Sequence, residues 1–225
     1  MRQIVLDTET TGLDAAQGHR VIEIGCLEIL NRRVSGATYH VYLNPDREID
    51  AGAIQVHGLT NEFLADKPRF ADVATEFLEF VRDAELVIHN APFDVGFLNA
   101  EFLRLGEGPV TRWCGVTDTL KLAKELHPGQ KNNLDALCKR YGVDNSGRAY
   151  HGALLDAQLL AEVYLAMTRG QESLGIEVGP APGASRVSVE RGKALRVIQA
   201  DTSEMEAHQA YLDVLAKESG EARSW

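Results

Sequence analysis

Cysteine is scarce in this chain, and its placement excludes two classes of small, cross-linked protein. The three cysteines are Cys26, Cys114 and Cys138, and they form no Cys-x-x-Cys pair. An odd number of widely separated cysteines does not predict a disulfide framework or a zinc site. A reducing cytosol is therefore the expected environment.

Long apolar runs are also missing. No segment stays apolar for the roughly 20 residues that a membrane helix needs. The N-terminus leads almost directly into Ile4-Val5-Leu6, without the apolar region and cleavage site of a secretory signal. We therefore expect a soluble, cytoplasmic protein with no membrane partner.

Positive charge is in deficit. The 225 residues include 23 Lys and Arg against 33 Asp and Glu, a net charge of −10. This balance argues against a protein that holds a polynucleotide by itself, because such binding depends on neutralising phosphates. A nuclease with this charge would rely on a partner to present its substrate. The hydrophobic content of 44% is sufficient for a buried core.

The pattern of apolar residues predicts a mixed sheet covered by helices, an α/β fold. The first half predicts three strands with short links, which indicates antiparallel neighbours, at residues 3–6, 21–30 and 38–43. Further strands are expected at 85–89 and 112–116. Helices are expected over 70–81, 92–105, 117–126, 133–141 and 153–167, the second of them capped by Asn90. Together these elements describe an α/β domain over residues 1–169.

The character of the sequence changes after this domain. Residues 170–194 contain Gly-Pro-Ala-Pro-Gly and show no sustained periodicity, which is typical of a flexible linker. Residues 195–225 regain some apolar content, but too little for an independent core. A short element that docks on another protein fits this segment better than a second domain.

Asp7 and Glu9 lie two residues apart at the end of an apolar strand. Positions i and i+2 of a strand project from the same face, so both carboxylates can reach one point above the sheet. A shared metal ion requires this arrangement. The alternative is an ordinary polar strand end before the turn that begins at Thr10.

Two further acids occupy positions near apolar segments. Asp94 lies in the first turn of the helix that follows the fourth strand, where the alternative is an acid that only stabilises the helix dipole. Asp156 lies in a helix that is apolar on most sides, where a structural, hydrogen-bonded acid is the alternative. His151 is placed on the loop that enters this helix. A histidine there suits a general base, although a solvated loop residue would look the same.

These motifs together favour divalent metal ions. Four carboxylates in apolar surroundings are costly unless a cation compensates them, and their motifs contain no Lys or Arg. Asp-x-Glu, His-Asn-x-x-Phe-Asp and His-x-x-x-x-Asp, in this order, closely resemble the DEDD exonucleases of the histidine type. Within that family, residues 6–13, 56–60, 133–138 and 151–157 resemble the proofreading epsilon subunits of bacterial DNA polymerase III.

The resemblance implies a ribonuclease H-like fold, with a five-stranded mixed sheet and flanking helices. It also implies a 3′–5′ exonuclease that removes mispaired 3′-terminal nucleotides as 5′-monophosphates during DNA replication. Two Mg²⁺ ions, for which Mn²⁺ can substitute, would be held by Asp7, Glu9, Asp94 and Asp156, with His151 as the base that activates water.

The same resemblance suggests residues that hold the 3′-terminal nucleotide. They are Thr10, Thr11, Gly12, Leu13 and His57, although His57 could instead be a surface turn residue. The DNA backbone could contact a set of basic residues, for which an ordinary solvated helix face is the stronger interpretation: Lys121, Lys124, Lys131, Lys139, Arg140 and Arg148.

The tail carries two partner hypotheses. Gln171, Leu174 and Ile176 resemble a peptide that binds the sliding clamp, although the segment lacks the aromatic final residue of the stronger motif. Residues 195–225 resemble the segment by which epsilon subunits dock on the polymerase subunit, and an unimportant C-terminus is the alternative. Two other functions stay open: a stand-alone RNA 3′ exonuclease with the same site, and a non-catalytic polymerase-associated scaffold.

Overall fold

The computed structural model describes residues 1–147, 150–169 and 200–219. Contacts divide the chain into two units, Met1–Gly175 and Ile176–Trp225. Within the second unit the described part contains one helix, α8 (Thr202–Ser219).

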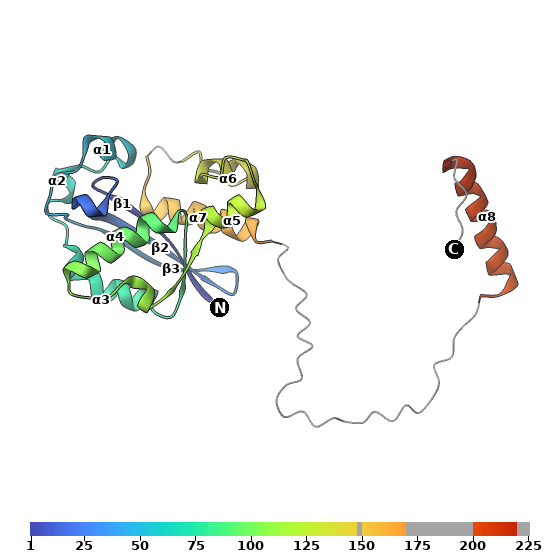
Figure 1. Ribbon diagram of the computed structural model, residues 1–225, viewed down its shortest axis with the longest axis horizontal. Coiled ribbons are helices and arrows are strands. Elements are labelled where there is room, and N and C mark those ends of the chain that lie inside the picture. Colours follow the sequence, from blue (N-terminus) through green and yellow to red (C-terminus); the bar gives the residue numbers. More distant parts are fainter. Residues whose placement is uncertain (148–149, 170–199, 220–225) are drawn as a thin grey trace, which may run out of the picture. The chain divides into compact units, whose positions relative to one another are not determined.

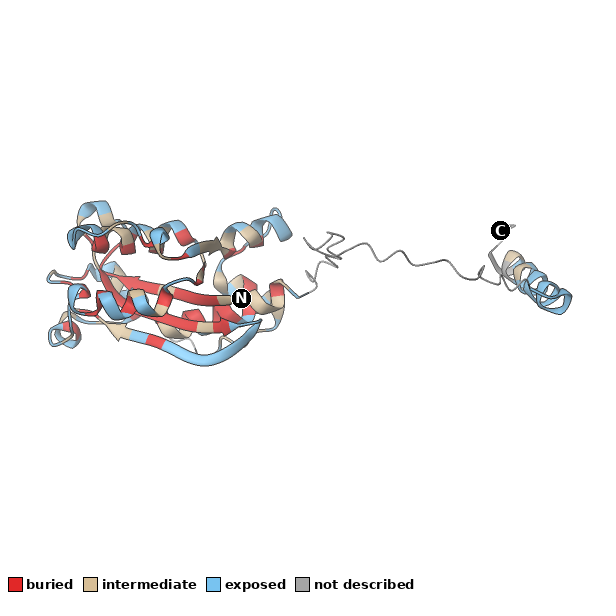
Figure 2. Cartoon of the chain, turned by 90° about the horizontal axis from the view of Figure 1, so that it is seen from below, coloured by how far each residue is buried: buried red, intermediate tan, exposed pale blue. Residues whose placement is uncertain are grey.

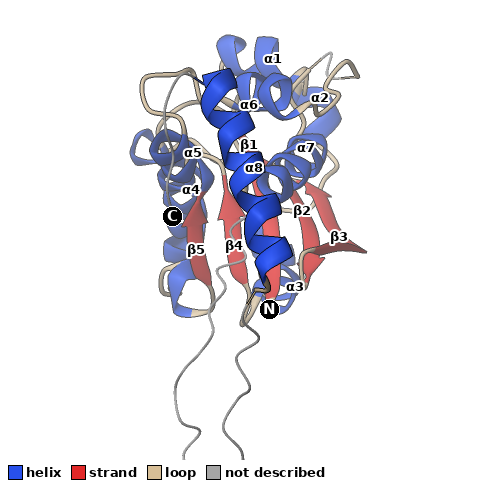
Figure 3. Cartoon of the chain, turned by 90° about the vertical axis from the view of Figure 1, so that its right-hand side faces the viewer, coloured by secondary structure: helices blue, strands red, loops and turns tan. Residues whose placement is uncertain are grey.

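A five-stranded mixed sheet runs through the first unit, in the order β3-β2-β1-β4-β5 (Figures 1 and 3). The strands are β1 (Arg2–Thr10), β2 (Val21–Leu30), β3 (Arg33–Tyr42), β4 (Glu85–Ile88) and β5 (Gly115–Asp118). The first three form antiparallel pairs, whereas β4 is parallel to both β1 and β5. The central strand β1 is therefore bonded on both sides.

Seven α-helices and two short 3-10 helices surround the sheet in the described part of this unit. The α-helices are α1 (Ala51–His57), α2 (Asn61–Leu64), α3 (Phe70–Val81), α4 (Ala91–Arg104), α5 (Thr119–Leu126), α6 (Leu134–Tyr141) and α7 (Ala153–Met167). The 3-10 helices are Ala15–Gln17 and Val110–Arg112.

Alternation along β1 sends its side chains into two separate cores. Ile4 and Leu6 pack on one face with the apolar sides of α3 and α4. Val5 points to the opposite face, where it meets Ala157 and Leu160 of α7. Burial is concentrated on β1, β2 and β4 and on the helix sides that face the sheet, whereas β3 is largely exposed (Figure 2). Positions 7 and 9 continue the α7 face.

The predicted fold class is confirmed: the structure has a mixed five-stranded sheet with flanking helices. The helices α1 and α2 were not predicted, because they are only 7 and 4 residues long and offer little periodicity. The fifth strand was expected at 112–116 but spans Gly115–Asp118. Pro109 precedes a 3-10 helix at Val110–Arg112 that displaces its start.

Asn90 occupies the predicted cap position of α4 but does not cap it with its side chain. It adopts the left-handed conformation, with φ 69°, and its side chain makes no capping hydrogen bond. Its N–H instead donates to Asp118 at the end of β5, at 3.2 Å. This geometry turns the chain sharply from β4 into α4.

The predicted linker, with Gln171, Leu174 and Ile176, lies outside the described residues. The predicted C-terminal segment, residues 195–225, contains α8. Among the residues that the structure describes, no helix has the length and apolarity to cross a membrane.

Candidate active site

The four predicted acids and His151 line one cavity of about 400 Å³. It lies where the C-terminal end of β1 meets the N-terminal ends of α4 and α7. Asp7 and Glu9 project into it from the same face of β1, as the two-residue spacing predicted. Glu9 is buried and Asp7 is half-buried.

Asp94 reaches the cavity from the first turn of α4. Its Oδ1 accepts two hydrogen bonds from Thr8, one from the backbone N–H at 3.1 Å and one from the hydroxyl at 2.7 Å. Burial raises the pKa of Asp94 to about 7, and the bonds from Thr8 act in the opposite direction. A carboxylate in this position needs a cation nearby to stay ionised at neutral pH.

Asp156 enters from the first turn of α7, with only 3% of its side chain exposed. His151 precedes the helix, and its Nδ1 lies 3.3 Å from Oδ2 of Asp156. The imidazole is 46% exposed, in contrast to the acid beside it. Its backbone N–H donates to the carbonyl of Val56 at 3.1 Å, which ties the loop to α1. The predicted position of His151, on a loop at the edge of the site, is what the structure has.

Gly25 allows α7 to approach the sheet, and sequence reasoning missed it. It pairs with Asp7 across β1 and β2. A Cβ at this position would collide with the backbone of Ala153 and Leu154 in the first turn of α7. The available signal was a lone glycine inside an apolar strand, which often marks a close backbone approach.

A second cavity of about 450 Å³ shares Thr8, Glu9 and Phe93 with the first. Its wall is mostly apolar, and Leu13 stands at it with 86% of its surface exposed. The residues that line it are Thr8, Glu9, Thr10, Gly12, Leu13, Asp50, Gly52, Ala53, Val56, His57 and Phe93. The sequence did not predict Asp50, Val56 or Phe93 here.

Of the five residues expected to hold a nucleotide, four line this second cavity: Thr10, Gly12, Leu13 and His57. Thr11 does not line it, because its side chain is fully buried and contacts His19. His57 is 6% exposed and its Nδ1 accepts the N–H of Leu59 at 3.0 Å, so the alternative of a surface turn residue is wrong. Burial lowers the pKa of His57, which keeps the ring neutral.

Five of the six basic residues considered as DNA contacts lie on α5, α6 and the segment between them. The four lysines are exposed, namely Lys121, Lys124, Lys131 and Lys139. Arg140 is bound internally, to the side chain of Asn132 at 2.9 Å and the carbonyl of Lys131 at 2.8 Å. Arg148 lies outside the described residues.

The donor set of the first cavity fits a divalent cation. Within the described part of the chain, Glu9, His151 and Asp156 offer ligand atoms that all lie within 4.8 Å of one another. Asp7 and Asp94 add carboxylates to the same cavity. Carboxylate oxygens are the ligands that hard cations such as Mg²⁺ and Mn²⁺ prefer.

Comparison with known proteins defines the class. The family model described as "RNase_T: Exonuclease" matches residues 4–164, which include all five predicted site residues. Exonuclease X in complex with 5′ overhanging duplex DNA has a similar structure, with a TM-score of 0.60, 28% identity and coverage of 75% of this chain and 92% of that one. The zinc-bound Escherichia coli exonuclease I complex with single-stranded DNA shares the fold alone, with a TM-score of 0.67 at 20% identity, over 76% of this chain and 41% of that one. Fold and site thus define a metal-dependent exonuclease of the DEDD class.

Sequence relatives narrow the class to one family. The DNA polymerase III epsilon subunit of Escherichia coli K12 is 52% identical over 231 residues, which cover 97% of this chain and 95% of that protein. The epsilon subunit of Salmonella typhimurium LT2 is 51% identical with the same coverage. This chain belongs to the family of DNA polymerase III epsilon subunits. The predicted enzyme class, a 3′–5′ exonuclease of the epsilon type, is confirmed.

Proposed function

We propose that this chain is the proofreading subunit of a bacterial replicative DNA polymerase. It removes mispaired nucleotides from the 3′ end of the growing strand as 5′-monophosphates. The observation that carries this proposal is the convergence of Asp7, Glu9, Asp94, His151 and Asp156 on one cavity. Membership of the epsilon family supports the polymerase as the partner.

Asp7, Glu9, Asp94 and Asp156 would hold two Mg²⁺ ions, and Mn²⁺ would substitute for them. Their oxygens come from a central strand and two helix N-termini, so the site is built on rigid elements. When bound, the ions would polarise the scissile phosphate and neutralise the charge that develops on the departing 3′ oxygen. They would also remove the cost of burying Asp94 as an anion.

His151 is the general base in this proposal. Its contact with Asp156 orients the imidazole, and its exposure leaves the ring within reach of solvent water. A histidine suits proton transfer near neutral pH, where its neutral form is abundant. His151 would take the proton from the water that attacks the terminal phosphodiester.

The second cavity would hold the 3′-terminal nucleoside. It adjoins the acids through Thr8 and Glu9, so a sugar and base within it would place the following phosphate at the first cavity. Its apolar wall, including Leu13 and Phe93, suits a base ring better than a phosphate. A proofreader must accept all four bases. An apolar wall serves this purpose, because it contacts the face of any base without reading its polar edge.

The C-terminal segment would dock on the polymerase subunit. The described helix α8 exposes the apolar residues Met205, Tyr211 and Val214, which the polymerase subunit would cover. Gln171, Leu174 and Ile176 would form a second attachment, to the sliding clamp. Such tethers raise the local concentration of DNA at the site without a basic surface, which agrees with the net charge of −10.

The activity is tested with a 5′-labelled single-stranded DNA oligonucleotide, in Mg²⁺ and in EDTA. We expect stepwise shortening from the 3′ end in Mg²⁺ and none in EDTA. Asp7→Asn, which keeps the shape and removes the charge, should lower the rate by at least about 100-fold. Degradation that persists in EDTA, or a wild-type rate in the variant, would contradict the two-metal proposal.

The role in proofreading needs a separate comparison. Primer–template duplexes with matched and mismatched 3′ ends are supplied with and without the polymerase subunit, and an RNA oligonucleotide of the same sequence is run in parallel. We expect faster removal of the mismatched end and a further gain when the polymerase is present. A preference for RNA, with no response to the polymerase, would favour the stand-alone RNA exonuclease instead.

A further inference from the structure

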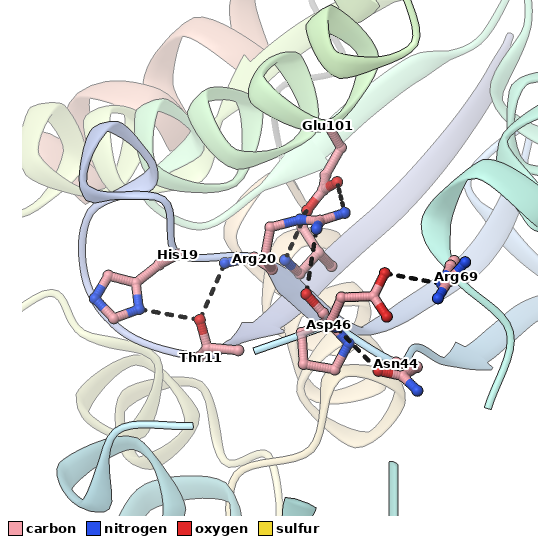
Figure 4. Close-up of polar contacts among 9 residues, drawn as sticks. Thr11, His19, Arg20, Asn44, Asp46, Arg69 and Glu101 are labelled. Carbon is pink, nitrogen blue, oxygen red and sulfur yellow. Dashed lines mark hydrogen bonds and ion pairs between the residues drawn. The ribbon is translucent and has the colours of Figure 1, made fainter. Parts of the chain in front are cut away.

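The loop between β1 and β2 is closed by a polar network that the metal centre does not use (Figure 4). Its central residue is Thr11, which is fully buried although it follows the strand that carries the acids. The Thr11 hydroxyl accepts the backbone N–H of Arg20 at 3.0 Å. The Thr11 N–H donates to the Arg20 carbonyl at 2.9 Å. Two hydrogen bonds therefore join the start of the loop to its end.

His19 lies within this loop and contacts Thr11 and two residues that line the second cavity, Gly12 and Asp50. Its Nδ1 is 3.0 Å from the Thr11 hydroxyl, and its Nε2 is 3.5 Å from a carboxylate oxygen of Asp50. A Cβ on Gly12 would collide with the His19 ring, so the ring packs directly on that glycine. Only 8% of His19 is exposed.

The partners of His19 favour one tautomer. A carboxylate can only accept, so a proton on Nε2 would face Asp50 across the 3.5 Å contact. Nδ1 is then an acceptor, and the Thr11 hydroxyl donates to it while it accepts from Arg20.

The bridge joins two opposite walls of the cavity. Gly12 and Leu13 form one wall, next to Thr11, and Asp50 begins the other at the start of α1. The Asp50 N–H also donates to the Thr11 carbonyl, at 3.0 Å. The loop is held from behind as well, because Arg20 makes two contacts of 2.7 Å with the buried carboxylate of Glu101 on α4.

We propose that His19 is a positioning residue for the 3′-terminal nucleotide: by bridging Thr11 to Asp50, it fixes the distance between the two cavity walls. His19 does not touch the reacting atoms, and it acts through the turn at Gly12 and Leu13. This inference rests on the proposed function, since it assumes that the second cavity holds the nucleotide. Its effect therefore falls on nucleotide binding and not on the hydrolytic step.

The test uses the full-length chain with two isosteric variants. Thr11→Val keeps the shape and removes the hydroxyl, whereas His19→Phe keeps the ring on Gly12 and removes both nitrogens. We expect KM for single-stranded DNA to rise about five- to tenfold in each, with kcat changed less than about twofold. The Kd for deoxythymidine 5′-monophosphate in Mg²⁺, measured by calorimetry, should rise by the same factor.

The double variant and a conservative rescue separate positioning from simple support of the fold. Because both substitutions break one bridge, the double variant should raise KM by clearly less than the product of the two single effects. Thr11→Ser, which restores the hydroxyl, should return KM to within about twofold of the wild type. The matched control is Thr168→Val, which removes a threonine hydroxyl bonded to Tyr164 outside both cavities, and it should leave KM unchanged.

Failure of this inference and failure of the proposed function would give different results. A lower melting temperature with unchanged KM and Kd would assign the bridge to stability alone and overturn the inference, as would fully multiplicative effects in the double variant. If His19→Phe fails to fold, the KM values of Thr11→Val and Thr11→Ser still show whether the bridge positions the nucleotide. A wild-type chain that binds the mononucleotide but does not shorten DNA would contradict the proposed function, not this inference.

Discussion

Asp94 is one of the buried carboxylates at this site. Only 3% of it is exposed, its Oδ1 accepts two bonds from Thr8, and burial raises its pKa to about 7. In the unfolded chain the same group has the ordinary value of 3.8. The metal-free folded state therefore binds one more proton than the unfolded state between these two values.

This difference predicts a pH-dependent stability. The contribution of Asp94 is fully present below pH 3.8 and is lost as the pH rises through about 7. Asp94→Asn keeps an acceptor for Thr8 and carries no charge, so in EDTA at pH 8 it should be more stable than the wild type, by on the order of 2 kcal/mol. At pH 5 about a third of this advantage should remain, and it should disappear below pH 3.8.

The measurement is urea unfolding of both proteins at pH 5 and pH 8, compared as a difference so that other titrating groups cancel. Mg²⁺ at pH 8 should stabilise the wild type more than Asp94→Asn, because only the wild type offers the fourth carboxylate. Equal stability of the two proteins at both pH values would show that burial of Asp94 carries no such penalty.

His151 gives a second prediction for one residue. His151→Gln retains a polar side chain that can contact Asp156 but cannot act as a base near neutral pH. We expect kcat to fall by about 100- to 1,000-fold, while the Mg²⁺ concentration for half-maximal activity changes little. Steady-state rates over a Mg²⁺ titration check this. A rate within a few-fold of the wild type would remove His151 as the base.

For single residues, the sequence predicts which side chains form the site better than it predicts the contacts around them. One cavity is lined by all five residues that the motifs predicted: Asp7, Glu9, Asp94, His151 and Asp156. They could be recognised in the sequence because their side chains are of types that bind metal ions or transfer protons. The same reasoning placed Thr11 with the nucleotide, whereas its side chain is buried away from that cavity. Which way a side chain turns within a loop depends on His19 and Arg20, whose contacts are not visible in sequence.

Helices and strands hold these residues in place. The contact between α7 and β2 is an especially close one. The first turn of α7, which carries Asp156, rests on Gly25 without room for a Cβ. Gly25→Ala should push α7 outward, lower the free energy of unfolding by about 2–3 kcal/mol and reduce kcat at least about tenfold. Urea unfolding and steady-state kinetics on the same preparation test both effects.

Gly96→Ala is the matched control for this substitution. Gly96 lies in α4, is exposed, and would meet nothing within 4 Å if it carried a Cβ. Alanine there should leave activity unchanged and raise stability slightly, because glycine is unfavourable inside a helix. If Gly25→Ala behaved in the same way, the close packing of α7 would have no bearing on the site.

Prediction of elements succeeded where periodicity was long. The helices α3 and α7 have the predicted bounds, Phe70–Val81 and Ala153–Met167, since each shows apolar residues over three or more turns. The short helix α1 was missed, although it contributes Val56 and His57 to the second cavity. Its seven residues have too little pattern, and its position follows from contacts with the turn after β1.

For the whole molecule, we expect the exonuclease activity and the polymerase attachment to be separable. A chain that ends at residue 169 retains the sheet, all seven helices described around it and both cavities. It should shorten single-stranded DNA at a rate close to that of the full chain but fail to co-purify with the polymerase subunit. Size-exclusion chromatography of the mixed proteins measures the second property.

A matched variant locates the attachment more closely. Met205→Asp with Tyr211→Asp keeps the chain length and charges the exposed apolar residues of α8. It should weaken the complex as the truncation does, without affecting activity on single-stranded DNA. Full complex formation by the truncated chain would contradict docking through residues 195–225. The sequence offered only composition for this segment, because a docking surface is defined by the partner that covers it.

The hydrogen bond from the His151 backbone N–H to the Val56 carbonyl links the two cavities. Val56 also lines the second cavity, so the loop that carries the proposed base and one wall of that cavity share the short helix α1. A substitution that shifts this helix should therefore disturb both cavities together.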